Sequence, residues 1–419
     1  MSDTGLWPSF MAPSDCGDDS RCAVSAAGHR VTFADGRTSL CGTSGLWNTN
    51  LGYGNAAIAA AITDALHDAS YLGLFRFENE YARRAAGELV ALTGERFARV
   101  LFSTSGGAAN DLTLKVLRHF HVLQRQPQRR LVAGLRGSYH GLMFGSAAVT
   151  GEDLGQRLYG VDQRLVRHVA PNDLQGLSAL LDQCGEQLAG LILEPVLGTG
   201  CIPLTAEFVA AVLAGRSEYG YLVVADEVAT GFGRTGPMFA SDLWPEAPDI
   251  MVVSKGLTNG TCAAAAVLVN ARIASTFWDA GPAGVLGHGE TQAGTPPTCA
   301  AISATINEFH RLDALAAGAR VASWLRADLD PLVGDHALAR TVTGRGLFLG
   351  LHLNGRDGQP MAQADVPDVV SAVRSAGAIV HPGLRGIQLV PALTYTRDEV
   401  TELVSAVEKG VEAWSRNRS

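Results

Sequence analysis

Lysine is rare in this chain, and one lysine lies where it could act as a nucleophile. The three lysines, Lys115, Lys255 and Lys409, stand against thirty arginines in 419 residues. Lys255 comes almost directly after an apolar run at residues 250–253, a pattern typical of a buried strand. Burial lowers the pKa of a lysine and leaves a neutral amine that can form a Schiff base. Taken alone, a lysine at a strand end is more often a solvated surface group.

Small residues after an earlier apolar run favour an anion site. Ser105, Gly106 and Gly107 follow the strand predicted at residues 99–102 and open a predicted helix. Glycines let backbone N–H groups approach an anion, and a helix N-terminus adds partial positive charge, so this arrangement suits a phosphate group. Serine and glycine before a helix also serve as an ordinary cap, and the motif alone does not separate these two interpretations.

Two more segments carry an aromatic ring and a carboxylate, one in a loop between glycines and the other at the end of a predicted strand. Tyr139 and His140 lie between glycines in a loop, where the tyrosine could stack on a planar ligand or pack in the core. Asp226 follows the apolar run 221–225, where its carboxylate could cap a helix, bind a metal or pair with a cationic ring nitrogen. Since no His or Cys cluster accompanies it, we expect no metal. A phosphate cradle, a ring stacker, a carboxylate and an amine together are what pyridoxal phosphate requires.

These four segments resemble, in order and roughly in spacing, the class III aminotransferases of the fold type I pyridoxal phosphate enzymes. Lys255 follows Asp226 by twenty-nine positions, and the segment from Asp226 to Gly236 is highly specific for the family. The resemblance covers about residues 30–400. Its further matching segments are residues 44–54, 193–196, 248–250, 288–291 and 344–348.

The resemblance implies a role for each matching residue. Lys255 corresponds to the Schiff-base lysine, which also moves a proton between substrate and cofactor, and Asp226 to the residue that keeps the pyridine nitrogen protonated. Tyr139, counted with these two as catalytic, would cover one face of the ring and Val228 the other. A homodimer is implied, because Thr291 resembles a phosphate ligand from the partner subunit. The implied cofactor-binding residues are Ser105, Gly106, Gly107, Tyr139, His140, Asp226, Val228, Lys255 and Thr291.

The chain departs from the family where a substrate carboxylate is usually bound. Positions 381 and 388 hold His381 and Gln388, where relatives carry arginines. Glutamine cannot replace the charge of an arginine–carboxylate pair. Either Arg385 or Arg76 has taken over this role, or the main substrate has no carboxylate next to its amine. We favour the second interpretation.

Two more residues resemble substrate-site positions. Trp47 stands where amine transaminases place an aromatic that shapes the substrate pocket, although a core role is equally compatible with it. Glu194 is in relatives a switch paired with arginine; here it would pair with His381 or Arg385, or simply end a strand. The implied function is an amine:ketone or amine:aldehyde transaminase of the omega type. One that tailors a natural product or peptide terminus is a narrower resemblance, as in the aminotransferases of daptide biosynthesis.

Three other functions are alternatives to a transaminase, and each makes a different demand on the sequence. A racemase, aminomutase or decarboxylase of the same family would keep the cofactor but need no second substrate. A cofactor-binding partner subunit without catalysis is disfavoured because Lys255, Asp226 and Tyr139 are all present. A nucleotide-dependent dehydrogenase is disfavoured because no G-x-G-x-x-G lies between a first strand and helix.

The elements that position these residues form an α/β pattern. Short apolar strands alternate with helical segments over residues 98–270, which predicts a mostly parallel sheet covered by helices on both faces. Before it, Asp35-Gly36 suggests a hairpin and residues 56–67 and 79–92 predict helices. A long alanine-rich helix is predicted from Cys299 to about Leu329. Beyond it we predict a strand at 346–351, a helix at 366–376, a strand at 387–390 and a closing helix at 397–415.

We predict two domains from this pattern. Residues 1–65 would form the N-terminal segment of a smaller α/β domain, 66–310 the large cofactor-binding domain, and 311–419 the C-terminal part of the small domain. Hydrophobic residues make up 47% and charged residues 18%, with a net charge of -8, so the chain is globular and a nucleic-acid partner is not expected. Seven cysteines without a C-x-x-C pair suggest reduced thiols and a cytoplasmic enzyme, and we expect neither a signal peptide nor a membrane span.

Overall fold

A seven-stranded sheet organises the larger half of the molecule. The computed structural model describes residues 5–335 and 339–416. Along the sheet the strands run β4 (Arg99–Ser103), β12 (Ala265–Val269), β11 (Ile250–Val253), β10 (Leu222–Asp226), β7 (Leu188–Leu193), β5 (Leu131–Leu135) and β6 (Val166–Val169). Only β12 runs antiparallel to its neighbours among the pairings that these strands make. The sheet is therefore mostly parallel, as predicted.

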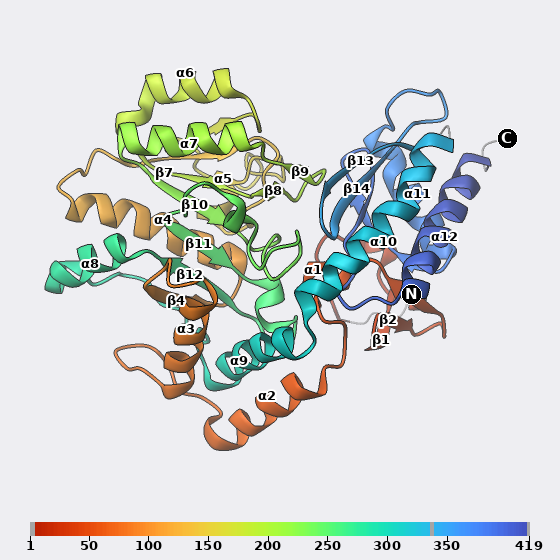
Figure 1. The fold of residues 1–419 in the computed structure, drawn as a ribbon, viewed down its shortest axis with the longest axis horizontal. Coiled ribbons are helices and arrows are strands. Elements are labelled where there is room, and N and C mark those ends of the chain that lie inside the picture. The colour runs from red at the N-terminus through yellow and green to blue at the C-terminus, as the bar shows by residue number, and fades with distance from the viewer. Residues whose placement is uncertain (1–4, 336–338, 417–419) are drawn as a thin grey trace.

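Helices bury both faces of this sheet (Figure 1). Side chains alternate along the strands: Leu222 and Val224 pack with the core on the face of α4, whereas Val223 packs with α6 and α7 on the opposite face. The helices of this half are α4 (Gly106–Leu123), α5 (Phe144–Val149), α6 (Leu174–Cys184), α7 (Ala206–Tyr219) and α8 (Ala271–Asp279).

The smaller half combines both ends of the described chain. One of its sheets has the order β1 (Ala23–Ala27), β2 (Arg30–Phe33), β3 (Thr38–Cys41) and β15 (Ala378–Ile379), so an N-terminal hairpin pairs with a C-terminal strand. The other has the order β13 (Ala339–Arg345), β14 (Phe348–Leu353), β17 (Gly386–Leu389) and β16 (His381–Gly383). Helices α10 (Ala314–Asp335), α11 (Val366–Ser375) and α12 (Arg397–Arg416) cover these sheets (Figure 1).

The remaining elements are the helix α9 (Pro296–Arg311), two helices that pack on it and several short segments. Helix α2 (Ala56–Ala69) packs on α9, as does α3 (Glu80–Leu92). The short elements are α1 (Ser44–Trp47), β8 (Val196–Leu197), β9 (Ile202–Pro203) and the 3-10 turns η1 (Pro13–Asp15), η2 (Asp19–Arg21), η3 (Gly185–Gln187), η4 (Ala240–Leu243), η5 (Lys255–Thr258), η6 (Gly281–Gly284) and η7 (Gln363–Asp365). No helix among the described residues is both long and apolar enough to cross a membrane.

The predicted helices and strands are found, with one error. The alanine-rich stretch after Cys299 is not a single helix: α9 ends at Arg311 and α10 begins at Ala314. Asp313 between them has a φ of 45°, in the left-handed region, which an α-helix cannot continue through. The domain boundaries at residues 65 and 310 stay a prediction.

A fully buried arginine holds the two halves together. Arg234, in the loop after β10, donates hydrogen bonds to the side chain of Asn50 and to the carbonyls of Leu347 and Pro391. Its exposed fraction is 0%, and burial lowers its pKa to about 9. One guanidinium thus joins the large sheet to an N-terminal and two C-terminal segments.

We expect Arg234→Leu to destabilise the protein strongly. Removal of the guanidinium leaves three buried acceptors without a donor, which costs about 3 kcal/mol in total. The melting temperature followed by circular dichroism measures the effect. Arg164→Leu, which removes an exposed arginine, is the matched control and should leave the melting temperature nearly unchanged. Equal melting temperatures for the two variants would contradict the linking role.

Candidate active site

Two adjoining cavities lie where the strands of the large sheet end. The first, of about 460 Å³, we call the inner cavity, and the second, of about 1100 Å³, the outer cavity. Trp47, Tyr139 and Lys255 line both of them. The structure therefore brings together, around the inner cavity, the sequence-predicted residues Ser105, Gly106, Gly107, Tyr139, His140, Glu194, Asp226, Val228 and Lys255.

Lys255 stands at the boundary between the cavities. It begins η5 directly after β11 and has a φ of 43°, an uncommon backbone conformation for a lysine that is typical of functional sites. Its ammonium nitrogen lies 4.7 Å from the centroid of the Trp47 ring. Burial lowers the pKa of Lys255, and the negative charges of Asp226 and Glu194 only partly oppose this effect. A neutral amine, the nucleophilic form, is thus easier to reach than on a free lysine.

Asp226 is a buried carboxylate with three hydrogen-bond donors. Its Oδ2 accepts hydrogen bonds from Asn110 Nδ2 at 2.8 Å and from His140 Nδ1 at 2.7 Å, and its Oδ1 accepts one from Val228 N at 3.1 Å. Burial acts to lower the pKa of His140, but the hydrogen bond with Asp226 and the charge of Asp226 outweigh it, so the pKa of His140 is raised. These donors hold the carboxylate of Asp226 in place beside the inner cavity.

Glycines bring two loops into contact beside the N-terminus of α4. Ser105 caps the helix, its hydroxyl accepting a hydrogen bond from Ala108 N. A Cβ atom on Gly141 would lie 2.4 Å from the Cα of Gly107, and one on Gly106 would lie 2.9 Å from Cγ1 of Val228. Larger residues would fill the space in front of the helix N-terminus. The N-terminus of α4 with Ser105, Gly106 and Gly107, which we call the phosphate cradle, and the polar groups around it fit a phosphate-bearing planar cofactor such as pyridoxal phosphate.

Glu194 is buried and bonded to backbone, which corrects one expectation. Its Oε2 accepts a hydrogen bond from Tyr139 N at 2.8 Å and its Oε1 one from Gly198 N at 3.0 Å. The predicted pairing with His381 or Arg385 is therefore wrong: two backbone donors already satisfy the carboxyl. Burial raises the pKa of Glu194 to about 7, although the charge of His140 and these two donors act in the opposite direction.

The phenol of Tyr139 remains protonated at neutral pH. Burial raises its pKa, and the carboxylates of Glu152, Glu194 and Asp226 add to the effect. The side chain is 38% exposed and faces both cavities. Tyr139 can therefore cover a ring and donate a hydrogen bond, but it is not a base.

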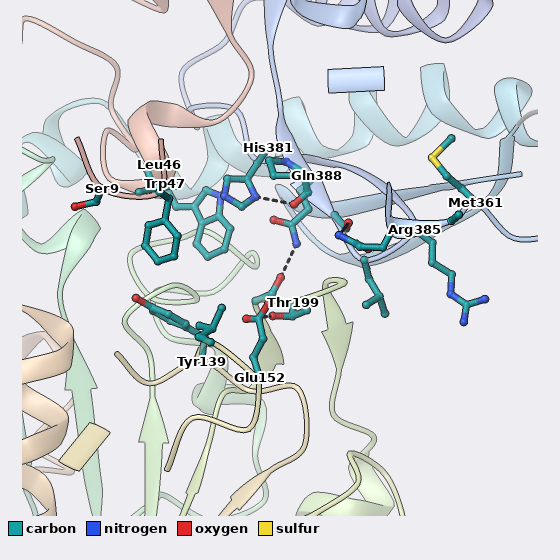
Figure 2. Close-up of a pocket in the computed structure, with 18 of the residues that line it drawn as sticks. Ser9, Leu46, Trp47, Tyr139, Glu152, Thr199, Met361, His381, Arg385 and Gln388 are labelled. Carbon is teal, nitrogen blue, oxygen red and sulfur yellow. Dashed lines mark hydrogen bonds between the residues drawn. The ribbon is translucent and has the colours of Figure 1, made fainter. Parts of the chain in front are cut away.

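The wall of the outer cavity comes from the β16–β17 hairpin of the smaller half. His381 on β16 pairs with Gln388 on β17, so both side chains lie on the same face, toward Trp47. The rings of His381 and Trp47 are 5.3 Å apart. Arg385 stands at the tip of the hairpin, exposed at the rim, and Figure 2 shows its guanidinium pointing away from Trp47 and Tyr139.

One predicted residue lies outside the cavities, and two residues that were not predicted line them. Thr291 is exposed on a loop and lies outside both cavities of this chain; Tyr71 donates a hydrogen bond to its carbonyl. The sequence analysis missed Asn110 and Glu152. Asn110 could have been found, since it lies one helical turn after Gly106 and so faces the same side. Glu152 carries no local signal in the sequence.

We expect Glu194 to make stability pH-dependent. Its folded pKa, about 7, exceeds the ordinary value of 4.5. The folded protein therefore binds this proton more tightly, and the stabilisation is present at low pH and lost as the pH rises through about 7. Glu194→Gln keeps the neutral shape, so between about pH 5 and about pH 8 the melting temperature of the cofactor-free variant should fall less than that of the unchanged protein. Glu186→Gln, at an exposed position, is the control, and a Glu194→Gln profile identical to the control would disprove the assignment.

Comparison with known proteins agrees with this geometry. The family model described as Aminotransferase class-III matches residues 14–411. An amine transaminase from an uncultivated Pseudomonas species, solved in its PLP-bound internal aldimine form, is 31% identical with a TM-score of 0.93 over 98% of this chain and 99% of that one. This similarity confirms the fold type I prediction.

Curated sequences give the same result. The diaminobutyrate--2-oxoglutarate transaminase of Halomonas elongata is 28% identical over 93% of this chain and 90% of its own. The omega-aminotransferase of Caulobacter vibrioides is 28% identical over 93% of both chains. A cradle for phosphate, a buried aspartate and a lysine of lowered pKa in one cavity, together with these matches, show that the chain belongs to the class III aminotransferases, which transfer amino groups with pyridoxal phosphate.

Proposed function

We propose that this aminotransferase acts on amines that have no carboxylate next to the reacting amino group, with a ketone or aldehyde as the acceptor. The observation that carries the proposal is the wall of the outer cavity. His381 and Gln388 line it, at positions to which the family resemblance assigns arginines, and Arg385 points outward at the rim (Figure 2). Burial lowers the pKa of His381, and the positive charge of Lys255 acts in the same direction, so His381 is neutral.

The catalytic roles follow from the environment of each residue. Pyridoxal phosphate, when bound, supplies an aldehyde that condenses with amines and a ring that accepts electrons. We assign Lys255 to hold the cofactor and then, as a neutral amine of lowered pKa, to take the proton from the substrate carbon and return it. Asp226, fixed by His140 and Asn110, would keep the ring nitrogen protonated.

Further residues would orient the cofactor. Tyr139 and Val228, which both line the inner cavity, would cover the two faces of its ring. The backbone N–H groups of Gly106 and Gly107 at the start of α4 would bind its phosphate, with Ser105 holding the turn. His140 would act through Asp226.

We further propose a homodimer in which Thr291 of each subunit reaches the other's phosphate. Exposed aromatic side chains support an interface near this loop: Phe75 is 52% and Phe77 78% exposed. Loop 71–77 contacts the Thr291 loop, since Tyr71 bonds to Thr291 and a Cβ on Gly289 would meet the Phe75 ring. Seven free cysteines support a reducing, cytoplasmic environment.

We propose that the carbonyl acceptor is a large molecule and not a simple ketone or aldehyde. An outer cavity of about 1100 Å³ is at the upper end of the range for small-molecule sites. Exposed apolar side chains, among them Phe10, Leu46 and Leu384, extend its lining to the surface. This space supports a natural product or a peptide terminus as the carbonyl substrate, as in daptide-type biosynthesis.

We expect amines without a neighbouring carboxylate to be the better donors. The purified holoenzyme is mixed with alkylamines or with glutamate and alanine, and loss of the visible absorbance of the cofactor is followed by stopped flow, with the carbonyl products identified by mass spectrometry. Amines should react at least about tenfold faster, because an unpaired carboxylate in this cavity loses its solvation without gaining a cation. Faster reaction with glutamate or alanine would refute the proposal.

We expect Asp226→Asn to keep the cofactor but to slow proton transfer by a factor of about a hundred or more. The asparagine has no charge to keep the ring nitrogen protonated. Single-turnover rates with a deuterated amine measure the proton-transfer step directly. Asp162→Asn, exposed and remote, is the matched control, and Lys255→Ala should abolish both turnover and the visible absorbance. An undiminished rate in Asp226→Asn would mean that another residue sets the charge of the ring.

A further inference from the structure

The side-chain carbonyl of Gln388 is a buried acceptor in the wall of the outer cavity. Gln388 is 2% exposed, and its Nε2 donates a hydrogen bond to Gly198 O at 2.6 Å. Its Oε1 has no hydrogen-bond partner within the part of the chain that the structure describes. Burial lowers the pKa of the neighbouring His381, and a hydrogen-bond interaction with the Gln388 side chain acts against this effect, although the ring does not reach full hydrogen-bond geometry with Oε1. A buried acceptor of this kind is costly unless a ligand or a water supplies a donor.

A carboxylate stands opposite this acceptor. Glu152 lines the same cavity, and its Oε2 accepts a hydrogen bond from Thr199 Oγ1 at 3.0 Å. Gly198 and Thr199 are consecutive, so a single turn fixes both Gln388 and Glu152. Figure 2 shows Gln388 reaching from the hairpin and Glu152 from the large half toward the Thr199 turn.

The described lining of the outer cavity holds one acidic side chain and, besides His381, two basic ones. Among its described lining residues, Glu152 carries a negative charge, while Lys255 and Arg385 are the basic side chains other than His381. The proposed chemistry uses Lys255, and Arg385 points outward (Figure 2). Glu152 is therefore left without a positive partner inside the cavity.

We infer that Glu152 and Gln388 Oε1 bind a second, positively charged amino group of the substrate, so that the preferred amine is a diamine whose other amino group condenses with the cofactor beside Lys255. An ammonium group offers three donors and no acceptor, which matches a carboxylate and a carbonyl placed together. Hydrogen bonds between charged groups are the stronger ones, so Glu152 contributes most of the discrimination. This inference rests on the proposed function and names its substrate class.

The test compares diamines with monoamines of equal length. The holoenzyme is given the terminal diamines of butane, pentane and hexane and the corresponding monoamines, and kcat/KM is measured for each. We expect the ratio of diamine to monoamine to exceed one for the best length and to fall about tenfold in Glu152→Gln, which corresponds to about 1.4 kcal/mol. Gln388→Leu should lower the ratio less. Glu207→Gln, on the exposed surface of α7, controls for the loss of one negative charge.

A binding measurement separates recognition from catalysis. N,N,N′,N′-Tetramethylpentanediamine, when protonated, carries two ammonium groups with one N–H donor each, but its tertiary amines cannot condense with an aldehyde, so isothermal titration of the holoenzyme reports binding alone. We expect about tenfold weaker binding to Glu152→Gln than to the unchanged protein or to Glu207→Gln. The melting temperature of each variant shows that it is folded, and Glu152→Ala replaces Glu152→Gln if the latter is not.

The outcomes distinguish this inference from the proposed function. If amines react but the ratio and the binding constant are the same in Glu152→Gln and Glu207→Gln, the diamine assignment is overturned and the proposed function stands. If only amino acids react, the proposed function fails, and the titration still decides whether Glu152 binds an ammonium group.

Discussion

The electrostatic balance around one buried carboxylate governs this site. Asp226 holds its charge in the interior because Asn110, His140 and the Val228 amide donate to it, and without them the charge would be too costly to bury. That charge reaches Lys255, whose pKa is lowered by burial and partly restored by Asp226 and Glu194. The amine is thereby neutral enough to react and still able to carry a proton.

The two cavities are built from different parts of the fold. The inner cavity is built on strand ends and the N-terminus of α4, where loops approach so closely that Gly107 and Gly141 leave no room for a side chain. The outer cavity is closed by the β16–β17 hairpin of the smaller half, which contributes few contacts to the large sheet. Changes in the hairpin, which carries His381 and Gln388, can therefore alter the outer cavity without disturbing the inner one.

The hydrogen bonds of Arg234 join the two halves of the molecule near both cavities. Arg234 joins the loop after β10, which also carries Val228, to Asn50 and Pro391. Trp47 and Gln388 lie close in sequence to those partners, on either side of the substrate space. The buried guanidinium thus bonds to both chain segments that carry these two lining residues of the outer cavity.

Much of the site followed from the sequence alone, because the carboxyl ends of parallel strands meet at one edge of a sheet. That rule predicts that Gly106, Tyr139, Asp226 and Lys255 lie together, and the periodicity of apolar residues predicted part of the helices and strands, among them β4, β10, β11, α2, α3 and α12. Periodicity did not show the break at Asp313, since one left-handed residue leaves the apolar pattern intact. The partners of Glu194, the outward direction of Arg385 and the placement of Glu152 and Gln388 in one cavity were decided only by the tertiary structure. They depend on strand register and on contacts between residues far apart in the chain, which no local pattern encodes.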